Sequence, residues 1–283
     1  MNATYDPGFG PLVQTRMRVV TWNVWGRYFE WEARQPVILD NLRRVDADVV
    51  CLQEAWQDGT RSQPEELAKE LGLPACLYAP AFEILGAWSG NAVLSRWPVV
   101  RHATAELPME GGGAVDTDGG ERRVVLFVEL EGPRGPVQVL CTHFSWRADW
   151  SGVRQAQART LCELVASTRP RQFPTIVCGD LNAHPDSDEL RQLTGVSAVP
   201  VPGVVFRDAW RAVRGDEPGW TAAKRNPYAA ATLEPDMRID YVLVGWPKLG
   251  GVGQVLSAHV VGDLAVDGVF GSDHFAVTAE LRY

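Results

Sequence analysis

The sequence predicts an α/β fold in which two β-sheets are covered by helices on their outer faces. Segments with strand character outnumber segments with helical periodicity along the 283 residues. Several strand segments, such as "DVVCLQEA" at 48–55 and "FPTIVCGD" at 173–180, are apolar at consecutive positions. This pattern is typical of strands that are buried on both faces. A sheet buried on both faces needs a layer on each side, which favours two sheets between helices.

The elements of the first half are recognised by their periodicity and their flanking residues. Residues 18–24, "RVVTWNV", predict a strand, and residues 35–48 carry apolar side chains at helical spacing, with Pro36 in the first turn. Residues 48–55 predict a buried strand. Residues 64–72, "PEELAKELG", predict a short helix that ends at Gly72. Two more strands are expected at 90–96 and 98–107.

The second half begins with a hairpin, because two apolar runs flank a Gly-Pro-rich turn within residues 122–144. Residues 152–168 predict an amphipathic helix. A buried strand follows at 173–180, and then a short helix at 186–193. The last two strands are expected at 238–246, "RIDYVLVGW", and at 273–283, "DHFAVTAELRY".

Composition indicates a folded protein with a large core, since 46% of the residues are hydrophobic. The net charge of −8 argues against a broad surface that coats nucleic acid, although a local basic groove is compatible with it. The five cysteines form no CxxC pair, and four lie in apolar runs, which indicates buried free thiols in a reducing compartment. No signal-peptide pattern or membrane-length apolar run is present. We therefore expect a cytoplasmic monomer without stable membrane insertion.

Polar side chains recur where the predicted strands begin or end, each within a strongly apolar run. They are Asn23, Glu54, His143, Asp180, Asn182, Asp240 and the pair Asp273-His274. Burying a charged group is costly unless it is paired or bound to a metal. These side chains are therefore expected to converge on one ionic site. Asp180 and Asn182 are expected to face the same cavity, because alternate residues of a strand share a face.

The chain resembles the endonuclease/exonuclease/phosphatase superfamily of deoxyribonuclease I-like metal-dependent phosphoesterases. The matching stretches occur in the family's order and span roughly residues 18–283. They are "TWNVWG", "LQEAW", "GNAVLSR", "THF", "GDLN", "RIDYVLV" and "SDHFAVTAEL". The resemblance implies a four-layer αββα sandwich with two mostly antiparallel sheets packed face to face. It also implies a single catalytic domain at 18–283, after an N-terminal extension at 1–17 that we expect to be poorly ordered.

The resemblance also implies a role for each candidate residue in the hydrolysis of a phosphate ester by an activated water. Mg²⁺, for which Mn²⁺ would substitute, is the implied cofactor, because an oxygen-rich site without thiolates suits a hard cation. The implied metal site comprises Glu54, Asn23 and Asp273. The implied catalytic residues are His143, Asp180, Asn182, Asp240 and His274. Arg122 or its neighbour Arg123 is expected on the phosphate, with Arg122 and Asn91 assigned to substrate binding.

The substrate class is less constrained than the reaction. "NVWG" and "LQEAW" look more like sphingomyelinase-type members than like abasic-site endonucleases, which favours a small molecule or a lipid head group. Two alternatives stay open: a nuclease acting on DNA or RNA, and a catalytically inactive phosphate-binding module. Plasmid nicking separates the first from a small-substrate hydrolase, and activity on any phosphodiester excludes the second. His102, His184 and His259 match no family position and are expected outside the site.

Overall fold

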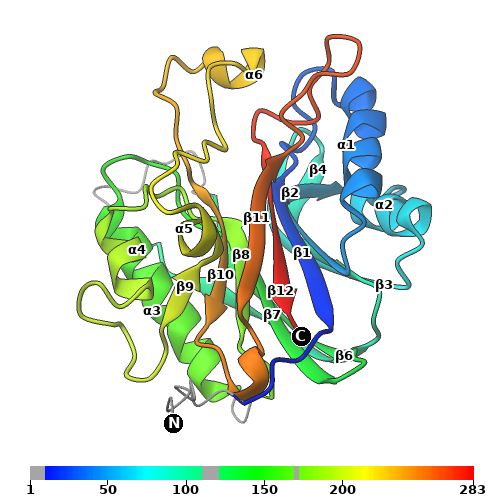
Figure 1. Ribbon diagram of the computed structural model, residues 1–283. Helices are drawn as coiled ribbons and strands as arrows, with labels where there is room; N and C mark the ends of the chain where they lie inside the picture. The colour runs from blue at the N-terminus through cyan, green and yellow to red at the C-terminus, as the bar shows by residue number, and fades with distance from the viewer. Residues whose placement is uncertain (1–9, 110–120, 169–171) are drawn as a thin grey trace, which may run out of the picture.

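The computed structural model describes residues 10–109, 121–168 and 172–283, which form two six-stranded sheets packed face to face (Figure 1). The first sheet contains, in spatial order, β11 (Val255–Val261), β12 (Ala276–Arg282), β1 (Arg16–Asn23), β2 (Val49–Gln57), β4 (Ala87–Ser95) and β3 (Ala75–Ile84). The second contains β5 (Val99–Leu107), β6 (Arg123–Gly132), β7 (Gly135–His143), β8 (Ile176–Asp180), β10 (Asp240–Gly245) and β9 (Phe206–Asp208).

Helices cover the outer face of each sheet and complete the four-layer αββα sandwich that the family resemblance implies. On the first sheet lie α1 (Trp31–Val45) and α2 (Gln63–Leu71), whose apolar side chains pack on β1, β2 and β4. On the second lie α3 (Ser151–Ser167) and α4 (Asp188–Leu193). The remaining short helices are α5 (Ala209–Arg214), α6 (Pro227–Ala230) and the 3₁₀ turn η1 (Leu249–Gly251). Within the described ranges, no helix has both the length and the apolar character required to cross a membrane.

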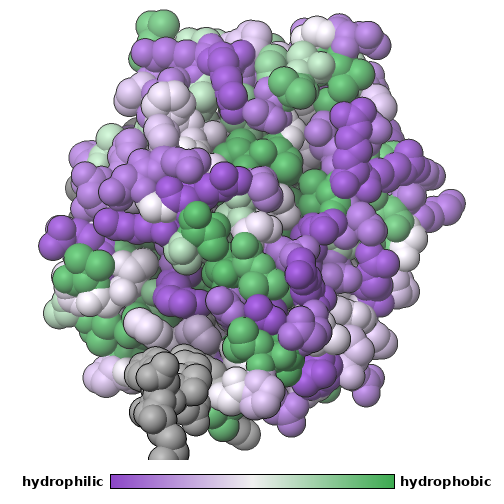
Figure 2. Space-filling model, viewed as in Figure 1, coloured by the Kyte–Doolittle hydropathy of each residue, from purple (hydrophilic) through white to green (hydrophobic). Residues whose placement is uncertain are grey.

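The interior between the sheets is apolar and closely packed. Branched side chains from both sheets, such as Val19, Val139 and Val277, are fully or almost fully buried there. The five cysteines are free thiols, and all except the half-buried Cys76 are buried. Burial of apolar area is the main stabilising contribution to such a core. The surface in Figure 2 mixes polar and apolar side chains over the same view.

Strand direction brings the predicted polar residues to one end of the sandwich. Each sheet is antiparallel except for one parallel pair, β1–β2 in the first sheet and β7–β8 in the second. Because parallel strands end at the same edge, Asn23 lies beside Gln53, and His143 lies beside Asp180. The antiparallel register of β8 and β10 sets Asp180 opposite Asp240. A row of three ionisable residues therefore crosses β7, β8 and β10.

Gly179 explains why a glycine precedes Asp180. A Cβ at this position would lie 2.1 Å from the carbonyl oxygen of Thr142 on β7, which is far inside van der Waals contact. Any side chain would push β8 away from β7 and displace the row.

The structure adds strands β9 and β11 and helices α5 and α6, which the sequence analysis did not predict, and it differs further in two elements that contain proline. Helix α1 begins at Trp31, so Pro36 lies inside the helix, beyond the first turn where we expected it. Strand β3 was not predicted, because Pro80 interrupts its pattern. It is tolerated because β3 is an edge strand with an irregular register between Pro80 and Phe82.

The chain before β1 is partly described. Residues 1–9 of the expected extension lie outside the described residues, whereas Val13 and Thr15 form hydrogen bonds with Gly250 and Tyr283. Strand β1 begins at Arg16, two residues before the expected start of the domain.

Candidate active site

The site lies where the ends of β1, β2, β7 and β8 meet, at a polar pocket of about 230 Å³. The pocket walls contain these residues from the sequence prediction: Asn23, Glu54, His143, Asp180, Asn182, Asp273 and His274. Asp240 lies directly behind His274. The structure thus brings together eight of the predicted side chains from segments that are far apart in the sequence. Tyr28 and Trp146 also line the pocket.

Three residues of the pocket have left-handed backbone conformations. The φ angles are 55° at Trp25, 53° at Glu54 and 48° at Asn182. At Glu54 the pairing of β2 with β4 is irregular, between Leu52 and Ala55. Non-glycine residues in this region cost conformational energy, and such residues concentrate at functional sites. The chain therefore leaves regular strand geometry where the predicted ligand and catalytic residues are presented.

Asn23 connects the two sheets at the centre of the pocket. Its side-chain Nδ2 donates to Glu54 Oε1 at 3.0 Å and to Asp180 Oδ2 at 3.1 Å. Its Oδ1 accepts from the backbone N–H of Trp25 at 3.0 Å, which fixes the amide orientation. Asn23 thus holds two carboxylates in place, whereas the sequence prediction made it part of the metal site.

Asp180 is buried at the centre of the row. Its Oδ1 accepts from the backbone N–H of Asn182 at 2.9 Å. Both side chains face the same pocket as predicted, but through a turn that follows β8 and not through strand alternation. Burial raises the pKa of Asp180, but His143 and His274, with the hydrogen bond from Asn23, lower it by more. Asp180 is therefore ionised throughout the neutral range.

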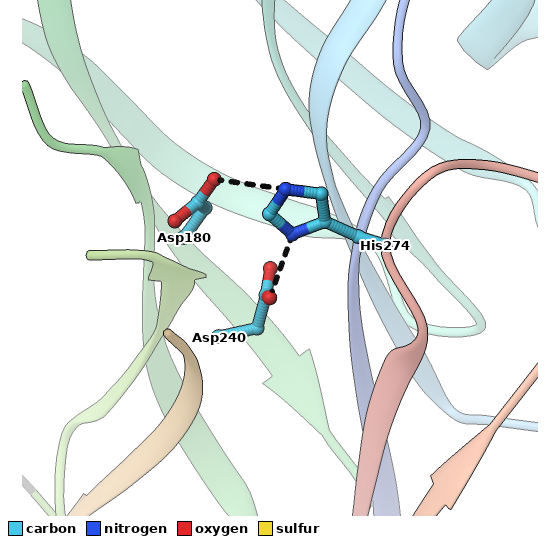
Figure 3. Close-up of side chains that lie close together, drawn as sticks. All are labelled: Asp180, Asp240 and His274. Atoms are coloured by element: carbon cyan, nitrogen blue, oxygen red, sulfur yellow. Dashed lines mark hydrogen bonds and ion pairs between the residues drawn. The ribbon is translucent and has the colours of Figure 1, made fainter. Parts of the chain in front are cut away.

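Asp240 and His274 form a buried acid–imidazole pair (Figure 3). His274 Nδ1 lies 2.8 Å from Asp240 Oδ2, and His274 Nε2 points at Asp180 Oδ2 from 3.9 Å. Although burial lowers the pKa of His274, three nearby carboxylates (Asp240, Asp180 and Asp273) raise it well above the usual value. The ring is therefore cationic at neutral pH. Arg238 does not compete for Asp240, since its guanidinium pairs with Asp208 at 2.7 Å.

His143 is oriented by Arg123. Arg123 Nη1 lies 3.0 Å from His143 Nδ1, and His143 Nε2 lies 3.3 Å from Asp180 Oδ2. His143 Nε2 also lies 3.1 Å from Asn182 Nδ2, so both ring nitrogens are engaged by neighbouring side chains. Arg123 and Asn182 therefore hold the ring of His143 beside Asp180, a role of Arg123 that the sequence did not indicate.

The sequence assignment of substrate contacts to Arg122 and Asn91 does not agree with their positions. Arg122 is half-exposed and pairs with Glu106 at 2.8 Å on the neighbouring strand β5. Its neighbour Arg123 points the opposite way along β6 and is the one that lines the pocket. Asn91 is buried between the sheets, where its Nδ2 donates to the carbonyl of Val124 at 2.8 Å. Its contact supports β6 next to Arg123.

The contrast between neighbouring arginines gives a testable prediction. Arg123→Met should lower kcat roughly 10–100-fold, the range found for residues that orient a functional group. The ring ¹⁵N shift of His143 Nδ1 should change, because this atom loses its contact with the guanidinium. Arg122→Met removes the same charge one residue away and should retain full activity. Equal losses in the two variants would show that charge alone matters, and that Arg123 does not act by orienting His143.

Glu54 and Asp273 form the oxygen-rich part of the pocket. Asp273 is partly buried, and desolvation, with the nearby charge of Glu54, raises its pKa to about 6 even though His274 opposes the rise. A carboxylate whose pKa is raised by burial and by a neighbouring carboxylate fits a divalent cation, which would relieve the repulsion. Asp180, Asp240 and His274 also approach within 4.8 Å of one another. In this second group the protonated imidazole of His274 lies between the two carboxylates. Its positive charge therefore already offsets their repulsion.

Arg34 is a buried residue that the sequence analysis missed. Its guanidinium donates to the carbonyl oxygens of Val24, Trp25, Gly26, Tyr28 and Gly271. It also lies 4.9 Å from the centre of the Trp25 ring. One side chain thus holds the whole segment that follows β1. The available signal was its spacing, because Arg34 precedes the buried Ile38 by four residues and shares the apolar face of α1.

A second cavity of about 490 Å³ adjoins the pocket and shares Trp146, Asn182, Asp273 and His274 with it. His184 lies in its wall. We expected His184 outside the site on the ground that it matches no motif. The turn after β8 carries it to the cavity, in the segment that also presents Asn182.

Comparison with known proteins agrees with this architecture. The sequence model of the Endonuclease/Exonuclease/phosphatase family matches residues 20–274. The chain is similar to the uncharacterised protein YbhP of Escherichia coli (strain K12), with 31% identity over 186 residues, 60% of this chain and 68% of YbhP. It is similar to human sphingomyelin phosphodiesterase 2, with 25% identity over 253 residues, 82% of this chain but 56% of that protein.

A solved structure extends the comparison to the whole fold. The endonuclease/exonuclease/phosphatase from Beutenbergia cavernae DSM 12333 has a TM-score of 0.67 and 25% identity, covering 95% of this chain and 72% of that chain. The family match covers most of the described strands and both sides of the pocket. The chain therefore belongs to the endonuclease/exonuclease/phosphatase family, whose members are hydrolases that act on phosphate esters.

Proposed function

We propose that the protein is a divalent-metal-dependent hydrolase that cleaves a phosphate ester by attack of a water molecule held at Asp180. The observation that carries the proposal is the position of this buried, ionised carboxylate. It lies between two histidines and shares Asn23 with the carboxylate of Glu54. The catalytic domain would comprise residues 18–283.

Asp180 would orient the water and accept its proton. Its ionised state supports this role, because only the carboxylate can accept a hydrogen bond from the nucleophile at both oxygens. Asn182 would fix the second side of the water or of the phosphate through its Nδ2, which already donates to the carbonyl of Phe144 at 3.0 Å. The proton of the water would therefore leave toward β8.

The two histidines would interact with the phosphate from opposite sides of Asp180. His274, cationic and held by Asp240, would place positive charge on a non-bridging oxygen. His143, held by Arg123 at Nδ1, would contact the phosphate through Nε2. Two fixed imidazoles suit a transition state whose negative charge is spread over several oxygens.

Glu54 and Asp273 would hold the metal ion, with Asn23 steering Glu54. Mg²⁺ is preferred for this position because it takes hard oxygen ligands and is typically held by one or two carboxylates. When bound there, a divalent cation neutralises the charge of the phosphate and stabilises the leaving oxygen.

The family match supports a phosphate ester as substrate, and similarity to sphingomyelin phosphodiesterase 2 supports a diester. A nuclease remains the alternative, since the family includes such enzymes. A catalytically inactive module is disfavoured by the hydrogen-bonded set of Asn23, Asp180, His143 and His274, because phosphate binding alone needs no buried carboxylate at its centre.

A hydrolysis panel in millimolar Mg²⁺ tests the proposal. It should contain nitrophenyl phosphodiesters and monoesters, nucleotides, glycerophosphodiesters, phospholipid vesicles, inositol phosphates, RNA and plasmid DNA. We expect turnover of at least one small ester, and none by Asp180→Asn. Nicking of plasmid with no turnover of small esters would favour the nuclease, and inactivity on every class would reject a hydrolase.

A further inference from the structure

The cavity beside the catalytic pocket is formed by three segments that cover its sides. They are residues 146–154, residues 182–187 and residues 222–237, which include α6. Its volume of about 490 Å³ lies within the range of sites for small organic molecules. Because Asn182, Asp273 and His274 line both spaces, a phosphate bound among them would extend its organic group into this cavity.

Trp146 stands at the junction of the two spaces. Its side chain lines both, yet 55% of the residue surface is exposed. The guanidinium of Arg147 lies 5.3 Å from the Trp146 ring and 5.2 Å from the Trp150 ring. A large ring that is held in place and left uncovered at a binding site provides a surface for stacking a planar group.

The other side chains that line the cavity limit which kinds of molecule can bind there. Polar side chains that hydrogen-bond, among them Ser187, Thr232 and Lys224, alternate with small apolar ones. An acyl chain would remove these exposed or half-buried polar groups from water and offer them no hydrogen bond in return, which is costly. The acidic residues Asp186 and Glu234 lie in the same wall and would repel the phosphates of a long nucleic acid.

We propose that this cavity binds the organic group of the substrate, and that this group contains a planar ring with polar edges, about the size of a nucleobase, stacked on Trp146. The inference rests on the proposed function, and it names the substrate class of the same site. Two sources share this chemistry, a nucleoside phosphate and a simple aryl phosphate. They differ in the hydrogen-bonding edges that the polar wall would contact.

Binding to Asp180→Asn in the presence of Mg²⁺ tests the proposal without turnover. The probes are nucleoside 5′-monophosphates, phenyl phosphate, glycerol phosphate and phosphocholine, measured by calorimetry and tryptophan fluorescence. Ring-bearing phosphates should bind at least roughly tenfold more tightly than the two without rings, as expected for one stacked base. A nucleotide that binds more tightly than phenyl phosphate would identify the nucleoside as the source, and equal binding would identify an aryl group.

Substitutions at two tryptophans provide the matched control. Trp146→Ala, made in the same background, should abolish the preference for rings, and Trp146→Phe should restore most of it. Trp246 follows β10 at its far end, is 64% exposed and has Arg207 stacked at 5.8 Å. Trp246→Ala should therefore leave the preference intact. Equal binding of ring-bearing and ringless phosphates, or an unchanged preference in Trp146→Ala, would overturn the inference.

The outcomes separate this inference from the proposed function. Hydrolysis in the panel without any preference for rings would reject the inference alone. Ring binding through Trp146 with no hydrolysis of any ester would reject the proposed function alone. Tighter binding of an oligonucleotide than of its mononucleotide, or of phosphocholine vesicles than of nucleotides, would reject a cavity built for a single small ring.

Discussion

Asp180→Asn is expected to fold and to lose roughly 10²–10⁴-fold in kcat, the range typical of a residue that takes a proton in the transition state. Asparagine retains an oxygen that can accept from the backbone N–H of Asn182. It cannot take a proton from water. Kinetics on the best substrate of the panel would measure the loss.

The stability of this variant should change in a defined direction. The folded-state pKa of Asp180 lies below its unfolded value, so its ionisation stabilises the fold above the unfolded pKa, and that stability is lost as pH falls through the folded value. At neutral pH, Asp180→Asn should therefore melt somewhat below the wild-type protein. As a control, Asp216→Asn changes an almost fully exposed carboxylate and should alter neither kcat nor the melting temperature. Near wild-type turnover in Asp180→Asn would assign proton transfer to another group.

Removal of divalent metal should abolish hydrolysis, and Mg²⁺ or Mn²⁺ should restore it, whereas Zn²⁺ should restore it poorly. The reason is the oxygen-rich pair Glu54 and Asp273, which has no thiolate nearby in the pocket. A cation that binds only the folded protein adds about 2.7 kcal/mol at a hundredfold excess over Kd. For a chain of this size, that corresponds to a rise in Tm of roughly 5–10 °C. Activity in excess EDTA equal to that with Mg²⁺ would exclude a metal requirement.

Glu54→Gln should remove most of this metal-dependent gain. Glutamine keeps an oxygen that accepts from Asn23 but loses the ligating charge. Activity at saturating Mg²⁺ should also fall strongly. Glu163→Gln, an exposed change on α3, should keep the full Mg²⁺ shift. If Mg²⁺ raised the Tm of Glu54→Gln and of the wild-type protein equally, the metal site would have to be reassigned to the group of Asp180, Asp240 and His274.

The sequence predicted the strand-end residues well because burial of polar groups leaves a local signal. Asn23, Glu54, His143 and Asp180 each follow an apolar run, and apolar strands with polar ends are recognisable without tertiary information. The same runs gave the two-sheet architecture, and the motifs gave the four layers. The two six-stranded sheets confirm the predicted architecture, and the family match confirms the family that the motifs indicated.

Contacts made between distant elements could not be predicted in this way. Side-chain alternation along β6 separates Arg122 from Arg123, but only the packing of β6 in the sheet shows which face meets the pocket. Strand β3 carries a proline that is acceptable only at a sheet edge. The position of His184 depends on a left-handed turn at Asn182, which no periodicity reports.

The pocket lies at a seam between two separate sheets. Asn23, Glu54 and Asp273 come from the sheet of β1, β2 and β12, whereas His143 and Asp180 come from the sheet of β7 and β8. A slip of one sheet over the other by an ångström would preserve every strand ladder, yet it would move Asp180 away from Glu54 and Asp273, and misplacement on that scale can cost about 10²-fold in rate. The turnover rate is thus more sensitive than the melting temperature to small shifts between the two sheets. Substitutions at Val139 or Val277, deep between the sheets, would slow the enzyme from a distance. On gradual warming, catalysis would cease while the strands were still folded.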